Sequence, residues 1–402
     1  MGRGLRGRPG QSVGREDRSG VPMLPRSGPR RPRPAVGLAP TRGRRRRERP
    51  PCHTKGVRDA MRVMMTGGTG FAGSHTVRRY IEAGHEVRLL VRDREKVRRI
   101  FDPQGIDIPE EDVIEGDIVD LATVERAMEG CDAVYHGAAL VDMRRKMASR
   151  VLETNARGVS NVIGHAVKRG LPRIVYVSSA SVFFAPGSGP IHLDMEIQPG
   201  TTAYARSKAQ AEQVVRTLQG TGAPIRVSYP TGIVGPDDPG LSDANEAVYI
   251  FFAQTGVTTS SGFQIVDVRD LAEVHLRLLE QEGGMARALA AGPMLDWAST
   301  YRILDEITGT RLWRFPMPGA PLRLLGSLGD LLKRYVYDFQ FPLTRDAMEY
   351  ATQWPGASGD EAAREFDVTF RSARETYTDT VRWLHEAGHL KARLVGKLAS
   401  AD

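Results

Sequence analysis

The chain of 402 residues contains few cysteines and no long apolar run. Cys52 lies in a basic N-terminal segment, and Cys131 begins a predicted strand. Two such cysteines provide no disulfide framework, which suits a reducing cytoplasm. No apolar run reaches the roughly 18 residues of a membrane span, and no apolar stretch follows the basic N-terminus as it does in a signal peptide. We therefore expect a soluble, cytoplasmic protein without a transmembrane segment.

The first 60 residues lack aromatic side chains and hold few acidic ones. They contain 17 Lys and Arg against 4 Asp and Glu, a net charge of +13, so the other 342 residues carry −5 of the total of +8. A segment this rich in Arg, Gly and Pro buries too little apolar surface to fold, and we expect residues 1–60 to be disordered. Clustered arginines could tether the chain to nucleic acid. Because no aromatic side chain is present to stack on bases, we favour an inert extension and expect no nucleic-acid binding.

Short apolar strands and helical stretches alternate between Met61 and Tyr229. This alternation is typical of right-handed βαβ crossovers. It predicts an α/β fold with a Rossmann-type doubly wound parallel sheet. The expected strands are 62–65, 86–91, 113–115, 133–136, 173–177 and 225–229. The expected helices are 74–83, 121–128, 153–169 and 203–219.

The pattern becomes less regular after Pro236, where Pro- and Gly-rich joints interrupt the chain. We interpret this part as a smaller C-terminal substrate-capping domain, with residues 264–268 returning briefly to the sheet. The predicted domains are an NAD(P)-binding Rossmann domain of residues 61–235 and about 263–290, a cap of residues 236–262 and 291–390, and a tail of residues 391–402.

The segment after the first strand is rich in glycine. Gly67, Gly70 and Gly73 stand between the strand and a helix, and the next strand follows at the spacing of a βαβ unit. Glycines in such a turn allow a tight bend, close approach of the backbone to a pyrophosphate, and close packing of helix on strand. The N–H groups and the dipole at the helix N-terminus also favour a phosphate. The spacing predicts a dinucleotide site, and an ordinary strand–turn–helix corner is the alternative.

Charged or polar residues follow the second, third and fourth strands. Where an NAD site usually has a carboxylate at the tip of the second strand, this chain has Val91 followed by Arg92. A guanidinium there would pair with the 2′-phosphate of NADP, so we favour NADP, although Asp93 could still hold the ribose of NAD. Asp117 could accept a hydrogen bond from the adenine amino group. His136 could act as a base, but a histidine at a strand end is more often a packed, hydrogen-bonded residue.

Tyr204 and Lys208 are separated by one helical turn, which puts phenol and ammonium on one helix face. The Lys208 cation, together with the charge of an oxidised nicotinamide, would lower the pKa of Tyr204 from its usual value near 10. Lys208 could also hold the nicotinamide ribose. A serine after the fifth strand, in the run from Ser178 to Ser181, could hydrogen-bond a substrate carbonyl beside Tyr204.

Together these motifs resemble the extended short-chain dehydrogenase/reductase family over about residues 61–390. The resemblance rests on residues 67–73, Asp117, 136–139, Ser179, Tyr204, Lys208 and 230–236. It implies that Ser179, Tyr204 and Lys208 form a catalytic triad, since Ser179 directly precedes an Ala-x-Val segment as the catalytic hydroxyl does in relatives. It implies no metal site, and it leaves a homodimer open. The cofactor-binding residues implied are Gly67, Thr69, Gly70, Phe71, Ala72, Gly73, Arg92, Asp117, Ile118, Ala138, Ala139, Tyr204, Lys208, Pro230 and Ile233.

Departures from the family pattern narrow the activity. Family dehydratases carry two carboxylates after the catalytic hydroxyl, whereas this chain has Ala180 and Ser181. Family epimerases hold a substrate diphosphate with an arginine at the position of Phe263, and residues 236–262 here contain no Lys or Arg. The pattern around Arg92 resembles NADP-dependent reductases of the dihydroflavonol and 3β-hydroxysteroid type. We therefore expect an NAD(P)-dependent oxidoreductase that interconverts a secondary alcohol and a ketone on a relatively apolar small molecule. The alternatives are a sugar-nucleotide epimerase with tightly bound NAD and a non-catalytic NADP-sensing regulator.

The predicted cap contains apolar side chains in three groups. Residues 248–252 and Phe263 could line an apolar pocket. The second group lies near helical spacing and consists of Leu322, Leu325, Leu328 and Leu332. It could form a lid or a membrane-surface helix, but we favour a helix packed against the cap core. The third group consists of four tryptophans, which we interpret as anchors of the apolar core. They are Trp297, Trp313, Trp354 and Trp383.

Overall fold

The computed structural model describes residues 60–142, 144–200, 202–335 and 344–400. The chain divides into Met1–Gly56 and a compact unit, Val57–Asp402, which contains every element below. The extension predicted to be disordered lies outside the described residues, apart from Ala60. Among the described residues, none of the helices combines the length and the apolar character needed to span a bilayer.

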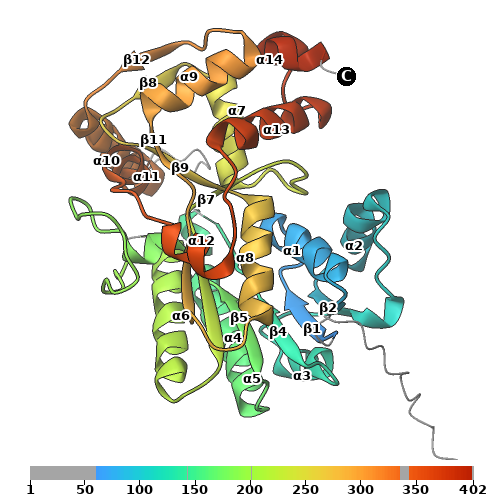
Figure 1. Cartoon of the computed structure of the whole chain (residues 1–402). Coiled ribbons are helices and arrows are strands. Elements are labelled where there is room, and N and C mark those ends of the chain that lie inside the picture. The colour runs from blue at the N-terminus through green and yellow to red at the C-terminus, as the bar shows by residue number, and fades with distance from the viewer. Residues whose placement is uncertain (1–59, 143, 201, 336–343, 401–402) are drawn as a thin grey trace, which may run out of the picture. The chain divides into compact units, whose positions relative to one another are not determined.

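Seven parallel strands form the central sheet, in the order β10-β6-β5-β4-β1-β2-β3 (Figure 1). The chain runs outward from β1 to β3 and then crosses back to β4 on the other side of β1. This reversal is the point at which open α/β sheets bind ligands, outside the carboxyl ends of the strands. The strands are β1 (Arg62–Thr66), β2 (Glu86–Val91), β3 (Val113–Glu115), β4 (Ala133–His136), β5 (Arg173–Val177), β6 (Ile225–Pro230) and β10 (Arg287–Ala290).

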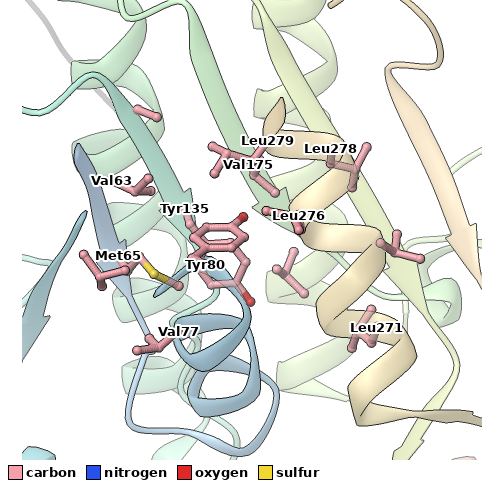
Figure 2. Close-up of a cluster of buried hydrophobic side chains, with 14 of the residues drawn as sticks. Val63, Met65, Val77, Tyr80, Tyr135, Val175, Leu271, Leu276, Leu278 and Leu279 are labelled. Atoms are coloured by element: carbon pink, nitrogen blue, oxygen red, sulfur yellow. The ribbon is translucent and has the colours of Figure 1, made fainter. Parts of the chain in front are cut away.

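Helices cover both faces of the sheet because its strands are apolar on both sides. Val63 and Met65 enter one buried cluster, and Met64 enters another, as the two-residue period of a strand requires. The first cluster includes Tyr80, Tyr135 and residues of α8, and Figure 2 shows these side chains meeting. On that face lie α1 (Phe71–Glu82), α2 (Arg94–Phe101), α8 (Val268–Glu280) and α12 (Asp360–Phe366). On the other face lie α3 (Leu121–Met128), α4 (Ala148–Val159), α5 (His165–Lys168) and α6 (Ala203–Gly220).

Two small sheets and six further helices make up most of the remaining described residues. Buried residues of α7, α9, α13 and α14 form a third apolar cluster. One small sheet has the order β11-β9-β7, and β12 pairs with β8. The strands are β7 (Gly232–Val234), β8 (Gly256–Thr258), β9 (Gly262–Asp267), β11 (Met294–Asp296) and β12 (Arg314–Pro316). The helices are α7 (Asp243–Ala253), α9 (Trp297–Thr308), α10 (Gly319–Tyr335), α11 (Arg345–Gln353) and α13 (Ala373–Glu386), followed by the short α14 (Ala392–Val395).

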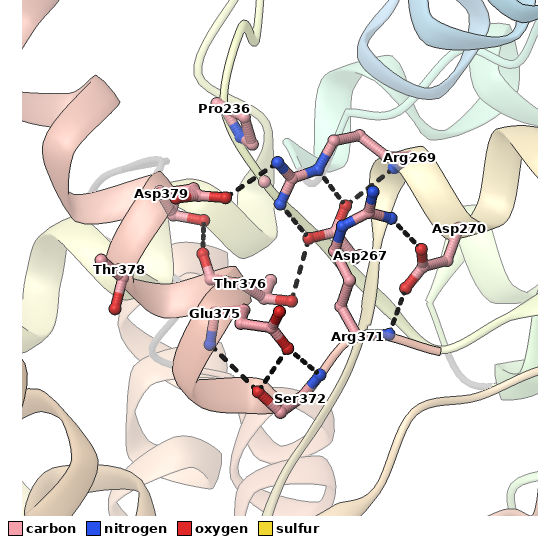
Figure 3. A network of polar contacts seen from close by, with 12 residues as sticks. Pro236, Asp267, Arg269, Asp270, Arg371, Ser372, Glu375, Thr376, Thr378 and Asp379 are labelled. Atoms are coloured by element: carbon pink, nitrogen blue, oxygen red, sulfur yellow. Dashed lines mark hydrogen bonds and ion pairs between the residues drawn. The ribbon is translucent and has the colours of Figure 1, made fainter. Parts of the chain in front are cut away.

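A polar network joins the start of α8 to α13 (Figure 3). The buried carboxylate of Asp267 accepts hydrogen bonds from Arg269 Nη2 at 2.7 Å and from Thr376 Oγ1 at 2.9 Å. Arg269 also pairs with Asp379 at 2.8 Å. Burial alone would raise the pKa of Asp267, but the bonds from Arg269 outweigh it, so the pKa is lowered. Asp267 therefore stays ionised and paired with Arg269 at the end of β9.

The predicted doubly wound parallel sheet is confirmed, and its six predicted strands end within one residue of those observed. Three details differ. The helix α2 was not predicted. Residues 264–267 belong to β9 in the small sheet and Val268 begins α8, because β10 occupies the edge of the central sheet beside β6. Residues 392–400, which we expected to be a tail, form α14 and a 3₁₀ helix, with Val395 and Leu398 buried in the third cluster.

Candidate active site

The turn between β1 and α1 brings three segments of backbone into contact. Gly67 has a φ of +78°, and a Cβ there would lie 2.6 Å from the Ala138 nitrogen, which follows β4. A Cβ on Gly73 would collide with the carbonyl oxygen of Gly67. Glycine is therefore required at both positions, by close approach at Gly73 and by approach and conformation at Gly67. Ala138 and Ala139 lie beside this turn, partly exposed.

The N-terminus of α1 offers backbone donors to an anion. Gly70 is its N-cap residue, so no side chain caps the helix, and the first turn contains no acidic residue. Thr69 precedes the cap; Phe71 and Ala72 begin the helix, with Phe71 buried edge-on against His75 at 5.6 Å. The orphan N–H groups of a helix terminus and its dipole suit a phosphate. The turn thus fits the dinucleotide diphosphate that the glycine spacing predicted.

Two arginines, Arg92 and Arg94, follow the end of β2, and only Arg92 is available for a ligand. Asp93 is used locally, because its side chain caps α2 through Lys96 N at 3.1 Å and pairs with Arg99 at 3.1 Å. Arg94 donates to the Val113 carbonyl oxygen at 2.5 Å. Arg92 is exposed and has no side-chain partner among the residues that the structure describes. A guanidinium, and not the Asp93 carboxylate, is therefore the group free to meet a nucleotide here.

The other predicted nucleotide contacts lie at or beside the carboxyl ends of strands. Asp117 follows β3, and its Oδ1 accepts a bond from Val119 N at 3.2 Å. Ile118 packs against Gly158, where a Cβ would lie 2.5 Å from its Cδ1. Pro230 ends β6, and Ile233 pairs with Val266 across β7 and β9.

His136 is a packed residue. Its Nδ1 lies 2.7 Å from Thr66 Oγ1, and its ring stacks on Tyr176 at 5.8 Å. Burial, followed by the charge of Lys208, lowers the pKa of His136 to about 3. The imidazole is therefore neutral, in line with the packed alternative that the sequence left open.

Lys208 ties helix α6 to the end of β5. Its buried Nζ donates to the Val177 carbonyl oxygen at 3.1 Å and lies 5.7 Å from the Tyr176 ring centroid. Ser179 follows Val177 by two residues, and its Oγ lies 2.8 Å from Ser181 Oγ. Tyr204 is the second residue of α6, one turn before Lys208. The three predicted catalytic side chains therefore arise from the end of β5 and the first two turns of α6.

Two buried polar residues, Glu212 and Asn155, hold this junction, and our sequence reasoning assigned no role to Glu212. Glu212, one turn after Lys208, accepts bonds from Ser178 Oγ at 2.8 Å and Tyr229 OH at 2.5 Å. Asn155 donates to Ser207 Oγ at 2.8 Å and exchanges two bonds with Leu140. The i, i+4 spacing of Lys208 and Glu212 was a usable signal for the first.

Burial shifts the pKa values of both Lys208 and Tyr204. Burial lowers the pKa of Lys208 to about 8, and Glu212 opposes that shift. Burial raises the pKa of Tyr204 above its ordinary value, with Asp243 and Tyr350 adding to it. The sequence argument expected Lys208 and the nicotinamide charge to lower that pKa. The protein's own groups, without the nicotinamide charge, raise the pKa and hold Tyr204 as a neutral phenol.

Aromatic side chains gather near Tyr204, and sequence reasoning missed two of them. Tyr350 of α11 acts electrostatically on Tyr204 and stacks on Phe184 at 4.3 Å and Trp354 at 5.9 Å. No local motif could reveal a contact between segments so far apart in the chain. Phe251, expected to line a pocket, is buried against Trp297 and Phe263 in the third apolar cluster.

A family model described as "NAD dependent epimerase/dehydratase family" matches residues 63–289. The chain belongs to this family. A protein named as a dihydroflavonol 4-reductase from Synechocystis sp. is 27% identical over 340 residues, 82% of this chain and 96% of its own length. A 4-hydroxy-2-methyl-3-oxo-4-farnesyl-3,4-dihydroquinoline-1-oxide ketoreductase from Stigmatella aurantiaca is 28% identical, covering 82% of this chain and 98% of its own length.

Solved structures show the same fold. A UDP-glucose-4-epimerase from Stenotrophomonas maltophila, with bound NAD and formylated UDP-arabinopyranose, superposes with a TM-score of 0.65 at 20% identity over 81% of this chain and 98% of its own. The resemblance to extended short-chain dehydrogenases and reductases is thereby confirmed. The chain is a member of a family of NAD(P)-dependent oxidoreductases and epimerases.

Proposed function

We propose that the protein is an NADP-dependent oxidoreductase that interconverts a secondary alcohol and a ketone on a relatively apolar small molecule. The observation that carries this proposal is the bond from Lys208 Nζ to the Val177 carbonyl oxygen. It anchors the first turns of α6, which bear Tyr204, beside the segment that bears Ser179. In this proposal the phenol of Tyr204, the ammonium of Lys208 and the hydroxyl of Ser179 act together on the substrate carbonyl.

The proposed chemistry divides the work among these three side chains. When bound, the reduced cofactor supplies a hydride for the carbonyl carbon. Tyr204, neutral in the protein's own field, donates its proton to the carbonyl oxygen, so that a C=O group becomes a CH–OH group. Ser179 orients that oxygen by a hydrogen bond. Lys208 holds the ribose and stabilises the phenolate that remains.

The preference for NADP rests on the tip of β2. The α1 turn would hold the diphosphate, and Arg92 would pair with the 2′-phosphate in the way that guanidinium groups bind phosphates. Asp93 supports this choice because its carboxylate is already engaged by α2 and Arg99. NAD is the alternative, as in the solved epimerase.

An apolar substrate is supported by the surroundings of Tyr204. Phe184, Tyr350 and Trp354 stack on one another, and Tyr350 acts on Tyr204. Residues 236–262 contain no Lys or Arg to neutralise a sugar-nucleotide diphosphate. Two relatives are named as reductases, one of them of a farnesyl-substituted ketone.

The experiment is NADPH oxidation by the purified chain with a panel of apolar ketones. Tyr204→Phe should lower kcat by about 10²–10⁴-fold, because it removes the proton donor, and should leave NADPH affinity nearly unchanged. Tyr377→Phe removes a phenol that is buried in α13 within the third apolar cluster, and it serves as the matched control, with turnover near that of the parent. Unchanged turnover in Tyr204→Phe would refute the assigned proton donor.

A further inference from the structure

The outward face of α10 is apolar. Its exposed leucines are spaced i, i+1, i+4, i+7 and i+8, which places them on one side of the helix. Leu324 is 64% exposed and Leu331 is 52% exposed. A surface helix of a water-soluble protein normally turns such a stripe toward its core. The leucine face consists of Leu324, Leu325, Leu328, Leu331 and Leu332.

The inward face of α10 is built from glycine. Gly326 is buried, and a Cβ there would lie 2.5 Å from the Thr344 carbonyl oxygen. A Cβ on Gly319 would lie 2.9 Å from Thr352 Cβ in α11. A helix in an apolar environment has the same arrangement, with small residues facing the protein and large apolar side chains facing outward. We had expected Leu325, Leu328 and Leu332 to pack against the cap core, and that prediction is wrong.

An aromatic and cationic edge precedes the leucine face in the chain. Trp313 is 83% exposed and Phe315 is 43% exposed, so the prediction of Trp313 as a core anchor is also wrong. Arg311, Leu312, Trp313 and Arg314 line a surface hollow. Arg314 pairs with Asp305 at 2.8 Å, whereas Arg311 is exposed and has no partner among the described residues. An exposed indole beside a guanidinium suits the boundary between acyl chains and phosphate headgroups.

We propose that the leucine face of α10, with Trp313, Phe315 and Arg311, docks on the surface of a phospholipid bilayer. A lipid surface offers acyl chains to the leucines and phosphates to Arg311, which precedes α10 in the chain by eight residues. The helix lies in the interface, since no described helix is long and apolar enough to cross the membrane. This inference is independent of the proposed activity.

The test is cosedimentation of the full chain with phosphatidylcholine vesicles. Their lack of net charge keeps the +13 of residues 1–60 from attracting the chain. Leu328→Ser/Leu332→Ser should reduce the vesicle-bound fraction by about tenfold. Leu121→Ser, at a 44% exposed leucine of α3, is the matched control and should bind as the parent does. Equal thermal midpoints for the three proteins would establish that all are folded.

A second readout uses the parent chain and needs no change to α10. Vesicles with brominated acyl chains should quench tryptophan fluorescence, and Trp313→Phe should remove most of that quenching. Failure of the parent to bind vesicles overturns the proposal. So does a dimer in light scattering that the double variant converts to a monomer without any vesicle binding, because the leucine face would then join two copies of the chain.

Discussion

Glycines allow close packing in two regions of this molecule, the turn after β1 and the helix α10, with opposite results. In the turn after β1, Gly67 and Gly73 let backbone meet backbone, so the N–H groups of α1 stay open to a ligand. On α10, Gly319 and Gly326 let the helix lie close to α11, and its leucines point outward. The first arrangement exposes polar backbone and the second exposes apolar side chains. What a glycine does is therefore decided by what lies across from it.

The largest expected effect belongs to Gly67→Ala. Alanine at φ +78° costs about 1–2 kcal/mol, and its Cβ would meet the Ala138 backbone nitrogen, which cannot move aside. We expect NADPH affinity to fall by at least about tenfold, an energy of about 1.4 kcal/mol, with a lower unfolding temperature. A fluorescence titration of NADPH measures the first. Affinity equal to that of the parent would mean that the turn is not the nucleotide site.

The next effect concerns Arg92. Loss of a charge-assisted hydrogen bond costs about 1.5–3 kcal/mol, so Arg92→Ser should raise the KM for NADPH by about ten- to a hundredfold. The KM for NADH should hardly change, since NADH lacks the 2′-phosphate. Arg98→Ser, which removes an exposed arginine of α2 that pairs with Glu95 and Glu110, is the control. Equal losses with both cofactors would show that Arg92 does not select the phosphate.

The pH dependence of reduction should report Lys208. Burial lowers the pKa of this ammonium to about 8 in the free protein, so its charge is present below that pH and lost above it. The kcat/KM for ketone reduction should therefore decline above about pH 8, whereas the raised pKa of Tyr204 keeps the phenol protonated there. Lys208→Arg should move the decline to higher pH. An unchanged profile in that variant would assign the titration to another group.

The smallest effect on the nucleotide site is expected from Gly326→Ala. The added methyl group would press on the Thr344 carbonyl oxygen and weaken the contact of α10 with α11. Overpacking of this kind costs about 1–3 kcal/mol, visible as an earlier thermal transition. NADPH affinity should match the parent. A loss of NADPH affinity as large as in Gly67→Ala would remove the distinction between the two regions.

The sheet could be predicted because its signals are local. Strands such as β2 and β3 are short apolar runs set at the spacing of βαβ units, and Gly67 marks the first turn. Strand partners are not local. The segments β9 and β10 are both short and largely apolar, and only the assembled sheet decides which one lies beside β6.

Sequence periodicity showed that the α10 leucines share a face but not whether that face meets protein. Gly319 and Gly326 lie against Thr352 and Thr344, so the glycine side of α10 meets the protein and the leucine side faces outward. The raised pKa of Tyr204 in the chain without cofactor was not foreseen for a similar reason. Burial of the phenol and its neighbours Asp243 and Tyr350 depend on α7 and α11, which the Tyr-x-x-x-Lys spacing does not contain.

The most direct test of the central claim is the stoichiometry of cofactor and product. The purified chain is mixed with NADPH and an apolar ketone, and the NADP⁺ and alcohol formed are counted by mass spectrometry. A proton donor and a hydride acting on the same carbonyl predict one NADP⁺ for each alcohol formed. No alcohol or NADP⁺ from any ketone, together with conversion of a sugar nucleotide to its epimer in a parallel mixture, would contradict the account.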